Sequence, residues 1–132
     1  MTGAVRDGSA MVAAMRPRLD PAAYVFVTGA APIAEALASF YEDEGLSQIL
    51  PERVAQAAGL DTTLPMARIV LEVHSALDGV GLTAAVASAL AAEEIACNMV
   101  AAFHHDHVFV PKADAERAIA VLQRLEHRAN SA

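Results

Sequence analysis

The stretch Arg68-Ile69-Val70-Leu71-Glu72-Val73-His74-Ser75 is followed, two residues later, by Asp78-Gly79-Val80-Gly81 and then by Leu82 to Ala92. The first segment is β-branched and apolar enough to form a strand packed on at least one face. The last segment has helix-forming residues at helical spacing. The glycine-containing segment between them is therefore predicted to be a short loop that joins a strand to a helix.

The following residues extend this pattern. Cys97 to Phe103 and His107 to Pro111 predict a hairpin across His104-His105-Asp106, and Asp114 to Leu125 predicts an amphipathic helix. The order strand, helix, strand, strand, helix puts both helices on one face of a sheet. The fold class is therefore α+β, with loops converging at sheet edges where backbone groups can meet a small ligand.

The first half of the chain contains a shorter version of the same order. Gly and Pro residues end most of its elements, and Asp61 to Pro65 is a connector between the halves. The expected strands are Tyr24 to Thr28, Ala38 to Asp43 and Leu46 to Leu50, and the expected helix is Glu52 to Ala58. The stretch Ala30 to Glu44 is ambiguous, because its Ala, Glu and Leu residues favour a helix, whereas Phe40-Tyr41 ahead of Glu44-Gly45 favours the strand.

The second half lacks one strand of a ferredoxin-like β-α-β-β-α-β unit. An open sheet edge would expose unpaired backbone groups, so Tyr24 to Thr28 is expected to supply the missing strand and to lock the halves into one unit. The predicted organisation is a loosely docked tail over 1–19, a truncated half over 20–62 and a fuller domain over 63–132. The tail has no continuous apolar run, so it is neither a signal peptide nor a membrane span.

Composition restricts the partners. The formal net charge of −7 disfavours binding to nucleic acid or to anionic membranes. The single Cys97 cannot form an internal disulfide and fits a reducing cytoplasm. We therefore expect a cytoplasmic protein with neither nucleic-acid nor membrane partners.

Several segments together resemble the small bacterial proteins built from tandem ACT-like domains. They are Leu71 to Ser75, Gly79-Val80-Gly81-Leu82-Thr83, Asn98 and His105 to Pro111, within a resemblance that spans about Tyr24 to Leu125. The resemblance implies paired ferredoxin-like halves packed as one unit, and an amino acid or similar small ligand bound at a domain interface against the first strand–helix loop. We also expect a homodimer, formed through sheet edges or helices. The residues that it assigns to the ligand site are Asp78, Gly79, Val80, Gly81, Leu82 and Asn98.

Each of these residues also has a purely structural interpretation. Glycines in a turn permit close approach, and they leave helix N–H groups free for a carboxylate, but they also serve steric needs alone. Asp78 could receive an amino group or cap the helix. Asn98, in an otherwise apolar strand, could bond a ligand or the neighbouring backbone.

Three alternatives are disfavoured. His104, His105, Asp106 and His107 have the residue types of a metal site, but consecutive strand residues point to opposite faces. The chain has no nucleophile elbow and no phosphate loop, so we expect no enzyme, catalytic residue, metal or cofactor. Glu52 to Thr63 resembles the start of a helix-turn-helix, but Pro65 would break the recognition helix.

The expectation from the sequence is therefore a regulatory protein that binds an amino-acid-like molecule. The main alternative is a structural or protein-interaction module without a ligand.

Overall fold

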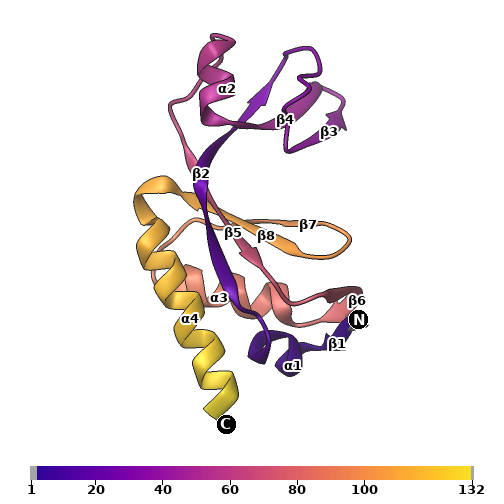
Figure 1. The fold of residues 1–132 in the computed structure, drawn as a ribbon, viewed down its shortest axis with the longest axis vertical. Coiled ribbons are helices and arrows are strands. Elements are labelled where there is room, and N and C mark those ends of the chain that lie inside the picture. The colour runs from indigo at the N-terminus through magenta and orange to yellow at the C-terminus, as the bar shows by residue number, and fades with distance from the viewer. Residues whose placement is uncertain (1–2, 132) are drawn as a thin grey trace.

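The computed structural model describes residues 3–131, which form a long twisted sheet with helices on one side (Figure 1). Six strands lie in the order β3-β4-β2-β5-β8-β7, all antiparallel to their neighbours. A separate parallel pair joins β1 to β6. The strands are β1 (Val5–Asp7), β2 (Pro17–Thr28), β3 (Ala38–Glu42), β4 (Gly45–Pro51), β5 (Met66–Leu71), β6 (Ser75–Val80), β7 (Asn98–Ala101) and β8 (Asp106–Pro111). The helices are α1 (Gly8–Ala13), α2 (Glu52–Ala57), α3 (Leu82–Ala92) and α4 (Ala115–Ser131), with a 3-10 turn at Lys112–Asp114.

Two ferredoxin-like units share the two central strands. The first unit runs β2, β3, β4, α2 and β5, and the second runs β5, α3, β7, β8 and α4. The sheet order makes β5 the last strand of the first unit and β2 the last strand of the second. Each unit therefore completes the sheet of the other, which gives one α+β body.

The prediction that a first-half strand completes the second half is confirmed for the strand and wrong for four of its five predicted residues. Strand β2 extends from Pro17 to Thr28, and its early residues pair with β5, from Pro17 opposite Leu71 to Tyr24 opposite Met66. Of the residues predicted to complete the second half, only Tyr24 pairs with β5, whereas Tyr24 to Thr28 pair with β4 on the other side of β2. One long strand thus serves both units in succession.

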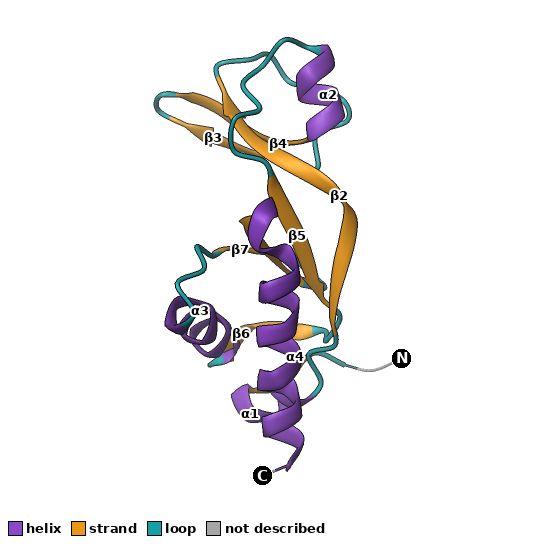
Figure 2. Cartoon of the chain, turned by 90° about the vertical axis from the view of Figure 1, so that its left-hand side faces the viewer, coloured by secondary structure: helices purple, strands orange, loops and turns teal. Residues whose placement is uncertain are grey.

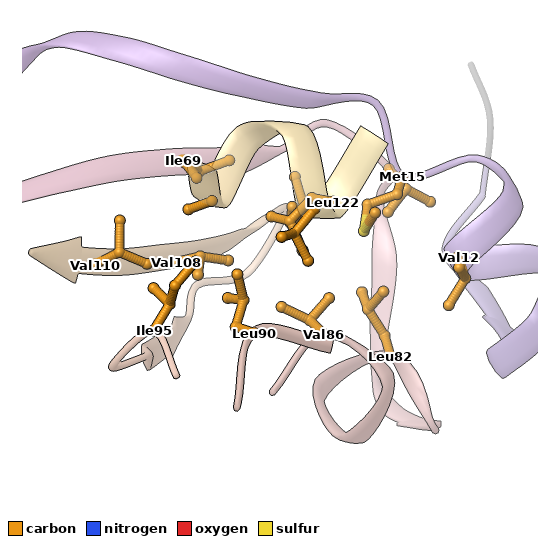
Figure 3. Close-up of a cluster of buried hydrophobic side chains, with 14 of the residues drawn as sticks. Val12, Met15, Ile69, Leu82, Val86, Leu90, Ile95, Val108, Val110 and Leu122 are labelled. Carbon is orange, nitrogen blue, oxygen red and sulfur yellow. The ribbon is translucent and has the colours of Figure 1, made fainter. Parts of the chain in front are cut away.

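The main core lies between the second unit's sheet and its helices (Figure 3). Ile69 and Val108 extend from β5 and β8 toward Val86 on α3 and Leu122 on α4, and all four are buried. Figure 2 shows α4 running beside α3 and α1. Helix α2 covers a smaller apolar cluster of Val25, Val27, Leu50 and Ala55.

The opposite face of the sheet carries no helix among the described residues. Its centre is aromatic: Phe109 makes edge-to-face contacts with Tyr24 and Phe26, with ring centroids 6.1 and 5.3 Å apart. Phe26 and Phe40 remain exposed on this face. Within residues 3–131, no helix combines the length and apolar composition needed to cross a membrane.

The prediction of a loosely docked tail over 1–19 is wrong for the described residues 3–19. Strand β1, helix α1 and the start of β2 occupy this segment. Met11 and Met15 are buried in the main core, and the backbone N–H of Glu72 donates to the carbonyl of Met15 at 2.9 Å. Met1 and Thr2 lie outside the described residues. The segment is held because its two methionines fill space between α3, α4 and the sheet.

The predicted strand Arg68 to Ser75 is also too long. Strand β5 ends at Leu71, and the chain then turns before β6 begins at Ser75. The predicted loop Asp78 to Gly81 is therefore mostly the end of β6, paired with the N-terminal strand β1.

Candidate ligand site at the junction of strand β6 and helix α3

Glycines allow the N-terminal segment to pack against the β6–α3 junction. Gly81 precedes α3 with φ = +116°, a backbone conformation that strains other residues. A Cβ atom at Gly8 would overlap the carbonyl oxygen of Val80. A Cβ atom at Gly79 would lie 3.1 Å from Cε of Met11. These glycines therefore meet the packing needs of β1 and α1, whatever else binds here.

The first turn of α3 presents backbone donors. The carbonyl of Gly81 accepts from Ala85 N–H at 3.0 Å, so the helix begins regularly. The N–H groups of Leu82, Thr83 and Ala84 precede the first intrahelical donor. No side chain in the described part of the chain caps this end. Such an end attracts anionic groups through its free N–H groups and the helix dipole.

A cavity of about 480 Å³ opens beside this helix end. Its walls come from α1, β6, the start of α3 and the turn end of the β7–β8 hairpin, at Ala101 and Asp106. Met11, Leu77 and Leu82 make part of the lining apolar. The volume falls within the usual range of small-molecule sites, and the mixture of apolar walls with a few polar groups is typical of them.

A buried polar pair lies at the hairpin side of the cavity. The Oγ hydroxyl of Ser75 donates to Oδ2 of Asp106 at 2.8 Å, and each residue is only 8% exposed. Ser75 begins β6, whereas Asp106 begins β8 opposite Ala101. This pair was not predicted as part of the site, because the sequence pattern placed Ser75 at a strand end and Asp106 in a turn.

The six predicted site residues divide into two groups. Gly79, Val80, Gly81 and Leu82 line the cavity. Asp78 does not line it: its side chain is 74% exposed and forms an ion pair with Arg6 at 3.0 Å. Asp78 also does not cap α3, since no side-chain hydrogen bond from the described residues reaches that helix end.

Asn98 lies far from this group in the fold. It pairs with Phe109 on the helix-free face of the sheet, whereas Ala101 and Asp106 at the other end of the hairpin line the cavity. Asn98 is exposed, although the apolar residues around it in the sequence suggest a buried strand. Asn98 cannot contact a ligand held at the start of α3 in this arrangement.

The histidines of the predicted cluster lie partly in loops and partly on a strand: His74, His104 and His105 are in loops, and His107 is in β8. The rings of His74 and His104 lie 5.3 Å apart, and Nδ1 of His105 is 3.4 Å from the Val73 carbonyl oxygen. His107 instead lies on the helix-free face, with Nδ1 3.2 Å from Nη1 of Arg68. No three His, Cys, Asp or Glu side chains within 3–131 come together as a metal ion would require.

Two further sequence features are settled by the fold. Strand β5 follows α2 and its connector, so the segment has no recognition helix and the helix-turn-helix alternative is excluded. Cys97 is half-buried, and burial raises the pKa of its thiol, which favours an unreactive side chain.

The architecture is a tandem pair of ferredoxin-like units with a cavity at a strand–helix junction. Residues 4–67 and 66–124 each match a model of the ACT domain. The chain therefore belongs to the ACT domain family. The match over 4–67 includes most of the segment that was predicted to be a tail.

Three solved structures are similar to this chain. A protein of unknown function from Vibrio cholerae, described as a possible transport protein, is 39% identical over 86% of this chain and 92% of its own, with a TM-score of 0.77. A protein from Agrobacterium tumefaciens is 19% identical over 79% and 81% of the two chains, with a TM-score of 0.59. The regulatory subunit of aspartate kinase from Thermus flavus is 12% identical over 85% and 98%, with a TM-score of 0.60. The last two show likeness of fold alone. A comparison with curated proteins finds no significant match.

Proposed function

We propose that this chain is a non-enzymatic regulatory protein that binds an amino-acid-like small molecule in the cavity at the start of α3. The observation that carries the proposal is the meeting of a cavity of about 480 Å³ with an uncapped helix N-terminus. A ligand carboxylate fits there because the first-turn N–H groups of Leu82, Thr83 and Ala84 can donate to it.

The comparisons support a regulatory role. ACT domains are typically ligand-binding regulatory modules, and one solved structure of similar fold is a kinase regulatory subunit. The protein acts in the cytoplasm as a homodimer, and its ligand site consists of Gly79, Val80, Gly81 and Leu82 together with Ser75 and Asp106. Asp78 and Asn98 are left out because neither lines the cavity.

A thermal-shift screen of the twenty standard L-amino acids tests this function. A ligand that binds only the folded state, supplied at about a hundred times its Kd, stabilises the protein by about 2.7 kcal/mol. The melting temperature should therefore rise by several degrees for one amino acid or for a small group of them. No rise with any amino acid would favour the ligand-free structural module.

Two matched substitutions on α3 locate the site. Ala84 lines the cavity in the first turn, whereas Ala91 is exposed in the last turn and does not line it. Ala84→Phe should fill the cavity and remove the thermal shift, and Ala91→Phe should retain it. Substitution of Gly81 would not separate the two effects, because its positive φ makes a Val variant strained with or without ligand.

A further inference from the structure

Asp106 is a buried carboxylate whose charge is not balanced within the described residues. It is 8% exposed, and no Lys or Arg between residues 3 and 131 forms an ion pair with it. Its one side-chain donor in this range is the neutral hydroxyl of Ser75, at 2.8 Å. A buried charge is costly without an opposite charge and further hydrogen bonds. A cation brought by a ligand would offset that cost.

The position of Asp106 makes this possible. It lines the same cavity as the first turn of α3, and no other side chain in the lining is ionisable. Opposite it, Ala101 contributes only a methyl group. The cavity therefore has an anionic acceptor on its hairpin side and backbone donors on its helix side. This division is complementary to a zwitterion that carries an ammonium group and a carboxylate.

We propose that Asp106, positioned by Ser75, binds the ammonium group of the ligand and so selects a free amine over the corresponding keto or acylated compound. This inference rests on the proposed function and assigns to Asp106 the role that the sequence suggested for Asp78. Ser75 holds one carboxylate oxygen, which leaves Oδ1 available to the ligand.

The first experiment uses the unaltered chain. Each amino acid that raises the melting temperature is compared by calorimetry with its 2-oxo acid and its N-acetyl derivative, which keep the carboxylate and lose the ammonium charge. A charge-assisted hydrogen bond predicts that both analogues bind about 10- to 100-fold more weakly. This comparison needs no variant, so it remains decisive where a substitution at Asp106 prevents folding.

The second experiment uses three variants of equal size change. Asp106→Asn should weaken amino-acid binding about 10- to 100-fold. Asp43→Asn, at an exposed position in the β3–β4 turn, should bind as the unaltered chain does. Asp78→Asn distinguishes the two candidate carboxylates: a loss of affinity there, with Asp106→Asn unaffected, would overturn the proposal.

Two small probes separate this inference from the proposed function. Propylammonium carries the ammonium group without a carboxylate, and propionate carries the carboxylate without an ammonium group. An amino acid could bind the Asp106→Asn variant as tightly as the unaltered chain, or the 2-oxo acid could bind the unaltered chain as tightly as the amino acid does. Either result would mean that Asp106 only connects β6 to β8 structurally, and the proposal of amino-acid binding would still stand. If no amino acid binds but propylammonium stabilises the chain and not its Asp106→Asn variant, cation recognition stands without amino-acid regulation. If neither amino acids nor propylammonium bind, both proposals are overturned.

Discussion

Arg68 donates two hydrogen bonds to one oxygen of Asp20, from Nε at 2.9 Å and from Nη2 at 2.7 Å. The two side chains are only 16% and 10% exposed. Asp20 lies in β2 where the pairing with β5 is irregular, between Leu19 and Ala23. The ion pair therefore holds the long shared strand at the point where it passes from one unit to the other.

Asp20→Asn should lower the free energy of unfolding by about 1.5–3 kcal/mol, because it removes a charged acceptor from Arg68 and from the Tyr24 hydroxyl. Urea denaturation at pH 7 measures the change, with the exposed Asp43→Asn as the matched control. Equal stability of the two variants would mean that the partly buried pair does not stabilise the shared strand.

The same substitution should change the acid dependence of stability. Burial by itself raises the pKa of Asp20, but hydrogen bonds from Tyr24, Ala22 and Arg68 outweigh it, so the pKa is lowered overall. Because the pKa of Asp20 is lower in the folded state, ionised Asp20 stabilises the fold fully at a pH above its unfolded-state pKa of about 4. This stabilisation is lost as the pH falls through the folded-state pKa. The difference between the unaltered chain and Asp20→Asn should therefore shrink from pH 6 to pH 3. A constant difference over this range would contradict the assignment.

His107 should give a second pH dependence, at higher pH. Burial and then the positive charge of Arg68 lower the pKa of its ring. Because arginine only donates, the contact with Arg68 also requires Nδ1 of His107 to be unprotonated. The pKa of His107 is therefore lower in the folded state than its unfolded-state value of about 6.5. Neutral His107 contributes its full stabilisation above about pH 6.5, and this contribution falls as the solution is acidified.

His107→Gln keeps a hydrogen-bond acceptor and removes the titration, so stability should fall less between pH 7.5 and pH 5.5 than in the unaltered chain. The exposed His127→Gln is the control and should keep the full slope. Urea denaturation at several pH values provides the measurement. An unchanged slope in His107→Gln would place the pH dependence on other histidines.

Gly8→Ala should destabilise the N-terminal segment, since the added methyl overlaps backbone at Val80 rather than a flexible side chain. A loss of about 1–3 kcal/mol is expected for such overpacking. Gly3→Ala is the matched control, because a Cβ there would meet no described atom within 4 Å. Hydrogen exchange should show faster exchange in β1 and β6 of the Gly8 variant. Equal protection in both variants would show that β1 and α1 are not anchored at the β6–α3 junction.

Local sequence signals were sufficient for much of the fold. Helix α3 begins and ends at the predicted residues, and β3, β4 and α2 agree to within one residue at each end. Gly45, Pro51, Gly59 and Gly81 mark several of these limits. The short N-terminal elements were missed since only Met11, Val12 and Met15 indicate burial in this segment. Three such residues are too weak a signal when glycines and charges surround them.

The candidate site was only partly predictable for a different reason. The turn from Gly79 to Leu82 is a local feature of the sequence, so its residues could be listed directly. Asp106 and Ser75 are 31 residues apart and meet only through the register of the hairpin with the sheet. Asn98 failed because the side of a sheet on which a residue lies depends on that register, which the sequence pattern does not specify.

Two N-terminal truncations test the shared-strand architecture together. The fragment 63–132 lacks β2, so it leaves the edge of β5 unpaired and also lacks Met11, Met15 and Leu19 from its core. It should aggregate or show no cooperative melting transition.

The fragment 16–132 keeps β2 but loses two buried methionines, so it should fold with a free energy of unfolding lower by at least about 3 kcal/mol. Size-exclusion chromatography and urea denaturation, with the full chain as reference, give the order of stability. A monomeric 63–132 fragment that melts cooperatively would show that the second unit completes its own sheet, and a 16–132 fragment as stable as the full chain would show that β1 and α1 contribute nothing to the core.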